Sequence, residues 1–286
     1  MQIREAYLAG SWYPKNKGAC ESQIREYEKN CKLINDNNLS YKIGIVPHAG
    51  WAYSGALAHK VIYNISRRNM PDVIFLAGGH LSADDCVYIM DACEVETPFG
   101  AMRCISDYNY DLLEGLRSKT EYGSSYEPDN TTELQLPFLK YYFPNSKIII
   151  CRIPPNDSAF LFAANLKKTT EKAELKFVFI ASTDLTHYGF RFNFMPAGRG
   201  AAALDWVKKE NDKSIIDAAL KIDARETLKL ANLKHNSCCG GAAAAAVALA
   251  GLYGLKSGAL ADYYTSADIV KENNITDFVG YAGIIF

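Results

Sequence analysis

The sequence predicts one α/β domain over residues 1–286, with a mixed or mostly parallel sheet sandwiched by helices. Short runs of apolar and β-branched residues alternate along the chain with longer stretches of helical periodicity. Several of those runs are apolar throughout, which is typical of strands covered on both faces, as in parallel sheets. No internal repeat or Gly/Ser/Pro-rich linker divides the 286 residues, so we expect one domain rather than two.

Strands are expected where the short apolar runs are bounded by turn residues. In chain order they are Ile43–Val46, Val73–Ala77, Ile148–Cys151, Phe177–Ala181, Ala259–Tyr264 and Phe278–Ile285. Helices are expected where charged and apolar residues recur at helical spacing. They are Glu21–Asn35, Gly55–Arg67, Thr131–Tyr142, Ala159–Thr169, Ala201–Glu210, Lys213–Leu220 and Asp223–Leu230, the last with Asp223 as its N-cap.

Composition narrows the classes of function. The net charge is −1, which gives no support to a nucleic-acid partner. The eight cysteines are scattered without a CxxC pair, which favours free thiols in a reducing cytoplasm. The N-terminal residues carry charge at once, so no signal peptide is expected. The most apolar stretch, Gly240–Leu252, is too short to span a bilayer, and we expect no membrane association.

Three of the five histidines lie on short Gly- or Pro-containing loops that follow predicted strands, and they are His48, His80 and His187. In open α/β sheets, ligands bind outside the carboxyl ends of the strands. If the three strands are parallel neighbours, the three side chains enter one crevice. The alternative for each is a structural hydrogen-bonding role. His59 and His235 lack this context and are expected to be surface or helix residues.

Cys239 is the fourth candidate, because it immediately precedes the Ala-rich stretch that starts at Gly240. A thiol at a helix N-terminus meets the positive end of the helix dipole, which favours the thiolate that binds metal or attacks a substrate. The alternative is a buried cysteine that acts as a small hydrophobe, which is what we expect of Cys238.

His48, His80 and Cys239 together would make a metal-binding set of two neutral nitrogens and one thiolate. Imidazole suits iron, copper or zinc, and thiolate favours the softer ions. Three protein ligands leave open positions, as catalytic metal sites do. His187 would then be free to act as an acid or base, since its reference pKa of about 6.5 suits proton transfer near neutrality.

Two acidic residues have competing interpretations. Asp184 stands three residues before His187, where it could orient an imidazole or bond the loop backbone. Glu133 follows Asn130 at the spacing of a helix capping box, with Asn130 as the cap, so a structural role competes with a place in the pocket.

Six motifs, read in order, cover nearly the whole chain. They are Ala9-Gly10-Ser11-Trp12-Tyr13-Pro14, Pro47-His48-Ala49-Gly50-Trp51-Ala52-Tyr53-Ser54-Gly55, Gly79-His80, Glu133-Leu134-Gln135-Leu136-Pro137-Phe138-Leu139, Ser182-Thr183-Asp184-Leu185-Thr186-His187-Tyr188-Gly189 and Cys239-Gly240. With these motifs in register, the chain resembles the Memo family, whose bacterial and archaeal members are often called AmmeMemoRadiSam system protein B.

The resemblance implies a fold related to the class III extradiol dioxygenases, which use non-haem Fe(II). It implies that His48, His80 and Cys239 replace that fold's two histidines and one carboxylate. His187 would stand where those enzymes keep their acid/base histidine, and Asp184 would line the same pocket. Family members have been linked to iron or copper binding and to redox chemistry, so Fe(II) is the expected cofactor, with copper or zinc as alternatives.

The chain departs from the family pattern after the late cysteine, where Gly241-Ala242-Ala243 occupies the stretch that usually holds a proline. The neighbouring Cys238 leaves open which sulfur coordinates. A thiolate in place of a carboxylate also changes the charge and redox behaviour of a bound metal, so ring cleavage does not follow from the fold.

Three functions fit these patterns. The first is a metal-dependent redox enzyme, similar to dioxygenases, that acts on a small molecule or a protein. The second is a metal-binding or protein-interaction module without turnover, in a vestigial dioxygenase pocket. The third is a metal-free hydrolase or thiol enzyme that pairs Cys239 with His187, and the absence of a Gly-x-Ser-x-Gly motif weighs against the hydrolase form.

Overall fold

The structure is a computed structural model that describes residues 3–34, 40–122, 128–270 and 276–286. Its main sheet has the strand order β10-β12-β2-β9-β3-β8-β4-β7, and β11 also pairs with β12. The strands are β2 (Ile43–Val46), β3 (Val73–Gly78), β4 (Val87–Asp91), β7 (Ser118–Tyr122), β8 (Lys147–Arg152), β9 (Phe177–Ser182), β10 (His187–Tyr188), β11 (Ala259–Thr265) and β12 (Phe278–Ile285). A small second sheet joins β1 (Ile3–Arg4), β5 (Glu94–Val95) and β6 (Met102–Arg103).

The centre of the main sheet is parallel and its margins are not. Strands β2, β9, β3 and β8 run parallel in that order. On one side β12 is antiparallel to β2, and on the other β4 is antiparallel to β8. Every residue of β2, β3 and β9 is buried, as expected for parallel strands with both faces covered.

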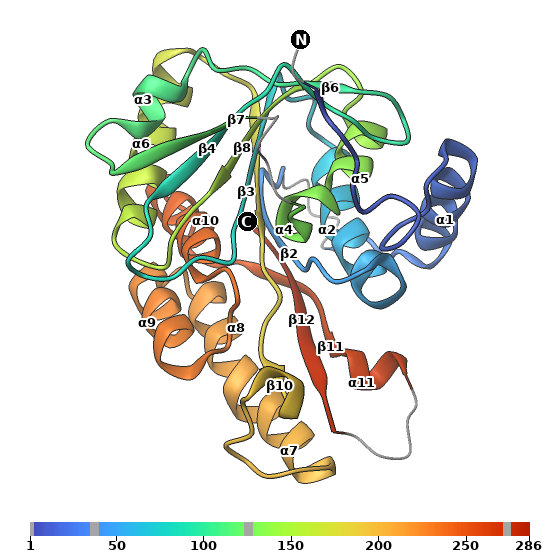
Figure 1. Ribbon diagram of the computed structural model, residues 1–286. Coiled ribbons are helices and arrows are strands. Elements are labelled where there is room, and N and C mark those ends of the chain that lie inside the picture. The colour runs from blue at the N-terminus through green and yellow to red at the C-terminus, as the bar shows by residue number, and fades with distance from the viewer. Residues whose placement is uncertain (1–2, 35–39, 123–127, 271–275) are drawn as a thin grey trace.

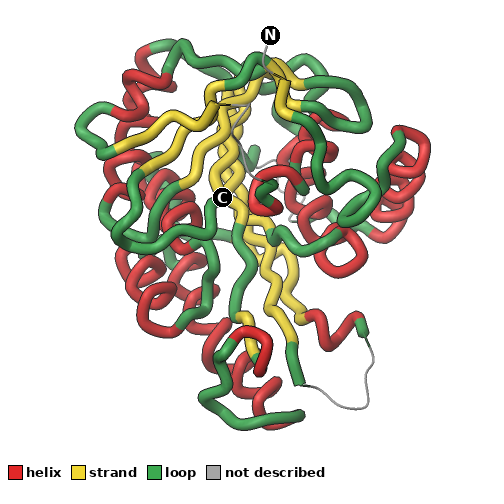
Figure 2. The backbone as a smooth tube through the Cα atoms, viewed as in Figure 1, coloured by secondary structure: helices red, strands yellow, loops and turns green. Residues whose placement is uncertain are grey.

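Helices cover both faces of the sheet (Figures 1 and 2). The longer ones are α1 (Lys17–Asn30), α2 (Ala56–Ser66), α6 (Ser158–Lys172), α8 (Asp212–Leu220), α9 (Ala224–Lys234) and α10 (Gly240–Leu252), and the shorter ones are α3 (Asn109–Leu113), α4 (Asn130–Glu133), α5 (Leu136–Tyr142), α7 (Ala201–Trp206) and α11 (Ser266–Ile269). Helix α2 packs on β2 and β12, and α10 packs on β9, β2 and α6. The predicted fold class, a mixed α/β sheet sandwiched by helices, is therefore confirmed.

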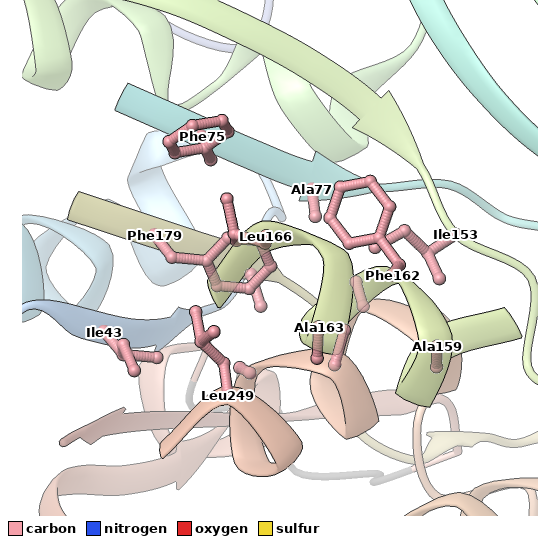
Figure 3. Close-up of a cluster of buried hydrophobic side chains, with 14 of the residues drawn as sticks. Ile43, Phe75, Ala77, Ile153, Ala159, Phe162, Ala163, Leu166, Phe179 and Leu249 are labelled. Atoms are coloured by element: carbon pink, nitrogen blue, oxygen red, sulfur yellow. The ribbon is translucent and has the colours of Figure 1, made fainter. Parts of the chain in front are cut away.

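Figure 3 shows the apolar layer beneath α6 and α10. Ile43, Phe75 and Phe179 rise from the central strands and meet Phe162 of α6 and Leu249 of α10. Each side chain is at most 3 % exposed. Burial of one such side chain contributes about 1.5–3 kcal/mol, so this layer fixes the depth at which both helices sit on the sheet.

Small residues let α10 approach the sheet closely. Ten of its thirteen residues are buried, most of them alanine or glycine. A Cβ atom on Gly241 would stand 2.2 Å from the carbonyl oxygen of Pro154 and 2.3 Å from that of Ile153. Only glycine fits here, and the same close approach fixes the start of the helix, directly after Cys239.

Most of the expected elements are present, with boundaries shifted by a few residues. The six expected strands correspond to β2, β3, β8, β9, β11 and β12, and Asp223 caps α9 as predicted. The expected helix Glu21–Asn35 begins earlier, at Lys17 after an Asn16 cap, and ends at Asn30. Asn35 lies outside the described residues.

Two helix predictions are wrong in part. The segment Thr131–Tyr142 is two helices, because Pro137 lacks an N–H and α5 restarts around it. The segment Ala201–Glu210 passes from α7 into a π-helical turn at Val207–Asn211. Similar irregular turns occur at Trp51–Gly55 (π) and Phe190–Phe192 (3-10).

Within the part of the chain that the structure describes, no helix combines the length and apolar character needed to cross a lipid bilayer.

We expect Gly241→Ala to destabilise the protein by about 2 kcal/mol, because the added methyl overlaps two backbone carbonyls that cannot move aside. Urea unfolding measures the loss. The matched control is Gly18→Ala in α1, where the nearest atom to an added Cβ is 3.9 Å away and no loss is expected. Equal stability of the two variants would contradict the close packing of α10.

Candidate metal centre

His48 stands just beyond β2, and three contacts fix its position. Its backbone N–H donates to Asp184 Oδ1 at 2.7 Å, and its Nδ1 lies 3.1 Å from Ser182 Oγ. Its carbonyl accepts from Asn130 Nδ2 at 3.1 Å. The side chain is 1 % exposed, so the ring is held rigidly with Nε2 facing the strand ends.

His80 is presented by a turn that only glycine can make. Gly79 has φ +106°, and a Cβ there would lie 2.6 Å from Arg152 Cβ. The Gly79 N–H donates to Thr131 Oγ1 at 3.0 Å, which ties this turn to the start of α4. The exposed His80 ring reaches back, and its Nε2 lies 3.2 Å from His48 Nε2.

The two adjacent cysteines arrive from the other side, on the turn before α10. Cys238 Sγ lies 3.3 Å from His48 Nε2 and 4.0 Å from Cys239 Sγ. The backbone of this turn is fixed as well, because the Cys238 N–H donates to the Asp184 carbonyl and the Cys239 N–H donates to Thr183 Oγ1, both at 3.1 Å.

His48, His80, Cys238 and Cys239 form a possible metal-binding group, with ligand atoms that all lie within 4.8 Å of one another. A tetrahedral ion such as zinc would separate its ligands by about 3.3 Å for two nitrogens, about 3.6 Å for nitrogen and sulfur and about 3.8 Å for two sulfurs. The contacts above are 3.2, 3.3 and 4.0 Å. These three separations are close to those of a tetrahedral ion.

Cys238 differs from its expected role as a small buried hydrophobe. The residue is half-buried, and its sulfur belongs to the group, 3.3 Å from His48 Nε2. Cys239, the expected ligand, belongs to the group too and is the N-cap residue of α10, as predicted. Chain order alone could not show that the turn directs both sulfurs to one side.

The pKa values of the two thiols are shifted in opposite directions. Burial opposes ionisation of Cys238, but the adjacent Cys239 thiol and the charge of His48 prevail and hold the pKa of Cys238 well below its usual value. Burial and the neighbouring Cys238 raise the pKa of Cys239 well above its usual value. Burial also lowers the pKa of His48, yet Cys238 and Asp184 raise it to about 9. These shifts favour a Cys238 thiolate beside a protonated His48, and they disfavour ionisation of Cys239.

Asp184 bonds the backbone of the group rather than an imidazole ring. It is 3 % exposed, and besides accepting the His48 N–H it accepts the Cys238 N–H at its own carbonyl. Burial raises the pKa of its carboxyl, against the lowering effect of His48. The sequence left two roles open for Asp184, orientation of an imidazole and hydrogen bonding to the backbone. The structure gives the backbone contacts.

A cleft of about 550 Å³ adjoins the group. Asp184 and Asn130, which both contact His48, lie on its wall, and so does His187. Exposed aromatic rings of Trp12 and Tyr53 line the cleft as well, at 41 % and 43 % exposure. None of the four residues of the group lines the cleft, so the cleft meets the group through Asp184 and Asn130.

The three strands that precede the candidate histidines are parallel neighbours, as the sequence analysis supposed. Their histidines nevertheless divide between two places. His48 and His80 meet, whereas His187 stands on β10, paired with β12, and packs edge-on against Phe192 at 4.9 Å between ring centroids. His187 is therefore a residue of the cleft wall, outside the four-residue group.

The predicted capping box at Asn130 and Glu133 is wrong. Asp129 is the N-cap of α4 and accepts the Thr131 N–H at 2.8 Å, which leaves the Asn130 amide free to reach His48. Glu133 is not among the residues that line the cleft.

Glu133 instead anchors the N-terminal segment. Its Oε1 accepts the Leu8 N–H at 2.7 Å and the Tyr13 hydroxyl at 3.1 Å, and Arg4 lies 3.4 Å from Oε2. Burial raises the pKa of this carboxyl, against those donors. Because Leu8 and Tyr13 flank Trp12, Glu133 acts on the cleft indirectly, by fixing the segment that carries an aromatic wall residue.

Two polar residues that the sequence analysis did not single out support the site. Gln135 Nε2 donates to the Pro47 carbonyl at 2.9 Å and lies 3.4 Å from Ser182 Oγ, beside the His48 ring. Asp212 of α8, fully buried, accepts the Thr186 N–H at 3.1 Å, the Tyr263 hydroxyl at 2.8 Å and the Thr186 hydroxyl. Asp212 thus anchors the loop from Asp184 to His187.

Comparison with known proteins gives the family. The profile of the family described as Memo-like protein matches residues 4–285. The chain belongs to the Memo family. Relatives named MEMO1 family protein come from Archaeoglobus fulgidus (28 % identity over 291 residues), Methanococcoides burtonii (27 % over 287) and Thermococcus onnurineus (26 % over 296), and each match covers 99 % of both chains. The Memo resemblance of the sequence motifs is therefore confirmed over the full fold.

Asp212 should make the stability of this Memo-family protein depend on pH. Burial raises the pKa of its carboxyl from 3.8 to about 6, against the hydrogen bonds from Thr186 and Tyr263. A group whose pKa rises on folding stabilises the protein most at low pH, and that contribution is lost as the pH rises through the folded pKa.

We therefore expect the free energy of unfolding of the wild type, relative to Asp212→Asn, to fall by about 2 kcal/mol between pH 4 and pH 7. Urea titrations of both proteins at several pH values measure it. Asp217→Asn on the same helix, where the carboxylate pairs with Lys213 at the surface, is the control and should show little change. A constant difference between wild type and Asp212→Asn would contradict the raised pKa.

Proposed function

We propose that this protein is a metal-dependent redox enzyme that acts on a small molecule bound in the cleft beside the metal centre. The observation that supports it is the meeting of His48 Nε2, His80 Nε2 and Cys238 Sγ at 3.2 and 3.3 Å, next to a cleft of about 550 Å³. Nitrogen and thiolate donors close to an open cavity are what a catalytic metal site requires.

The donor set limits the metal. Imidazole and thiolate suit iron, copper and zinc, whereas Mg²⁺ and Ca²⁺ prefer oxygen ligands. We assign Fe(II) first, with His48, His80 and Cys239 as its ligands, because the resemblance to extradiol dioxygenases implies that ion. Copper is the second assignment. The sulfur of Cys238 is a further soft donor, which favours copper or zinc over iron. When bound, such an ion would supply one-electron or Lewis-acid chemistry at the cleft.

The residues of the chain would supply binding and proton transfer. His187 stands on the cleft wall, where an imidazole can take or give a proton near neutral pH, and we assign it the acid/base role. Asp184 lines the same wall and would hold a polar group of the substrate or orient His187. The rings of Trp12 and Tyr53 would bind an apolar body and keep water from it.

A second function has an observation of its own. If both sulfurs coordinate, the four residues complete a tetrahedral shell and leave no open position, as in structural or storage sites. The protein would then hold a metal without turnover, in a vestigial pocket, and act through a protein partner.

We place the protein in the cytoplasm under both functions, since all eight cysteines are free thiols. The net charge of −1 favours no nucleic-acid partner.

Elemental analysis of protein purified anaerobically without a metal-affinity column should find close to one iron or copper per chain. His48→Ala should lose that metal, because the removed nitrogen is the one nearest both His80 and Cys238. His235→Asn is the matched control, since His235 is exposed, lies outside the group and has φ +50°, which asparagine tolerates. A wild type that binds no metal after reconstitution with Fe(II) and Cu(I) would refute the assignment.

His187→Ala should keep the metal and lose turnover by about 10²–10⁴-fold, the usual contribution of a positioned acid or base. Oxygen-consumption screens with catechol-like and thiol substrates give the activity, and elemental analysis of the same sample gives the metal. Loss of metal together with activity would make His187 a ligand. Full activity of the variant would remove it from the mechanism.

A further inference from the structure

Two adjacent thiols face the same point on the turn before α10. Consecutive side chains usually diverge, but here the Cys238 and Cys239 sulfurs lie 4.0 Å apart and belong to one ligand group. They also differ in access, because Cys238 is half-buried and Cys239 is 2 % exposed. A reagent in solvent can therefore reach Cys238 first, while Cys239 stays buried next to it.

We propose that Cys238 and Cys239 form a reversible vicinal disulfide, with a small disulfide such as oxidised glutathione as the oxidant, and that this modification excludes metal from the site. The inference rests on the proposed metal site. It states that the two cysteines are either oxidised to the disulfide or bound to an ion, and not both. It adds a redox-modification site to the metal centre.

The chemistry needs only the two thiols and the oxidant. The Cys238 thiolate attacks one sulfur of oxidised glutathione, a mixed disulfide forms and one glutathione thiolate leaves. The Cys239 sulfur then attacks Cys238 Sγ and loses its proton to the second glutathione as it departs. The protein gives up two electrons and the Cys239 proton, and one glutathione disulfide becomes one glutathione thiolate and one glutathione thiol. The thiolate then takes a proton from solvent, so the exchange balances.

The other cysteines provide a contrast within the chain. Cys20 and Cys151 are buried in the two core layers, and burial raises the pKa of Cys20 to about 11 and that of Cys151 further still. Burial raises the pKa of Cys104 to about 12. Such thiols stay protonated and react slowly, because the thiolate is the nucleophile. At the turn before α10, in contrast, a second sulfur lies 4.0 Å from Cys238 Sγ and can complete the exchange.

A bond between adjacent cysteines is easily reversed. Their Cα atoms are about 3.8 Å apart across a trans peptide, closer than the about 4.4–6.8 Å that relaxed disulfides span. Strained disulfides have higher reduction potentials and are the regulatory kind. In the disulfide neither sulfur is a thiolate, so the group keeps only His48 and His80 as donors. In the metal-bound form the sulfur lone pairs are occupied, and attack on the oxidant is blocked.

The test equilibrates the metal-free full chain in anaerobic glutathione buffers of increasing oxidised fraction. Alkylation of free thiols and mass spectrometry of the peptide that holds both cysteines follow. We expect this peptide to lose two hydrogens and both alkylation sites, and the oxidised protein to lose uptake of Fe(II) and Cu(I) until dithiothreitol restores it. Protein loaded with metal beforehand should keep both thiols.

Variants separate the two steps. Cys239→Ser should stop at a stable glutathione adduct on Cys238, and Cys238→Ser should form neither adduct nor disulfide at a comparable rate. Cys93→Ser, which removes an exposed cysteine outside the group, should behave as the wild type. A wild type that keeps the glutathione adduct, or keeps both thiols in fully oxidised buffer, would overturn the inference.

The outcome also separates this inference from the metal proposal. Reduced protein that binds metal but forms no vicinal disulfide would overturn the inference and leave the metal site standing. A vicinal disulfide in a protein that binds no metal in either redox form would refute the metal site and the exclusion of metal with it. Uptake of metal by the oxidised protein equal to that of the reduced protein would overturn the exclusion alone.

Discussion

The site depends on one buried residue, Asp184, because it joins segments that are distant in the sequence. Its carboxylate accepts the His48 N–H, and its carbonyl accepts the Cys238 N–H. A hydrogen bond to a buried carboxylate contributes about 1.5–3 kcal/mol, more than a neutral bond. The strand-end histidine and the thiol-bearing turn are thereby held against the same loop, and the separation of Nε2 and Sγ follows from these two backbone contacts.

Without an ion, the same geometry confines opposite charges. A thiolate at Cys238 and an imidazolium at His48 sit 3.3 Å apart in a largely buried place, where each ion compensates the desolvation of the other. Under the proposed metal assignment, binding of a cation would require the proton of His48 to leave, and the cation would then neutralise the sulfur in its place. The raised pKa of Cys239 keeps the second sulfur protonated until an ion or an attacking partner arrives.

The sequence predicted what depends on local pattern. Fully apolar runs located the central strands, and residues that follow strands located His48 and His80, since parallel strands end at one edge. The sequence did not predict the roles of residues whose partners are distant along the chain. Glu133 matched a capping-box spacing, yet Asp129 caps the helix and Glu133 turns to Leu8 and Tyr13, partners over a hundred residues away. Asp212 and the direction of Cys238 gave no local signal, because their roles arise only when α8 and α10 dock.

The order of the ligands along the chain has a consequence for how the protein matures. His48 and His80 emerge early during synthesis. Cys238 lies 190 residues after His48, on a turn positioned only when α10 packs on β2 and β9. Such long-range closure is slow and comes late in folding. The nascent chain therefore passes through a stage with two strand-end imidazoles and no thiol, which would hold an ion weakly. If the group binds a metal as proposed, selective capture would belong to the finished fold, and the ion would have to be delivered after translation ends.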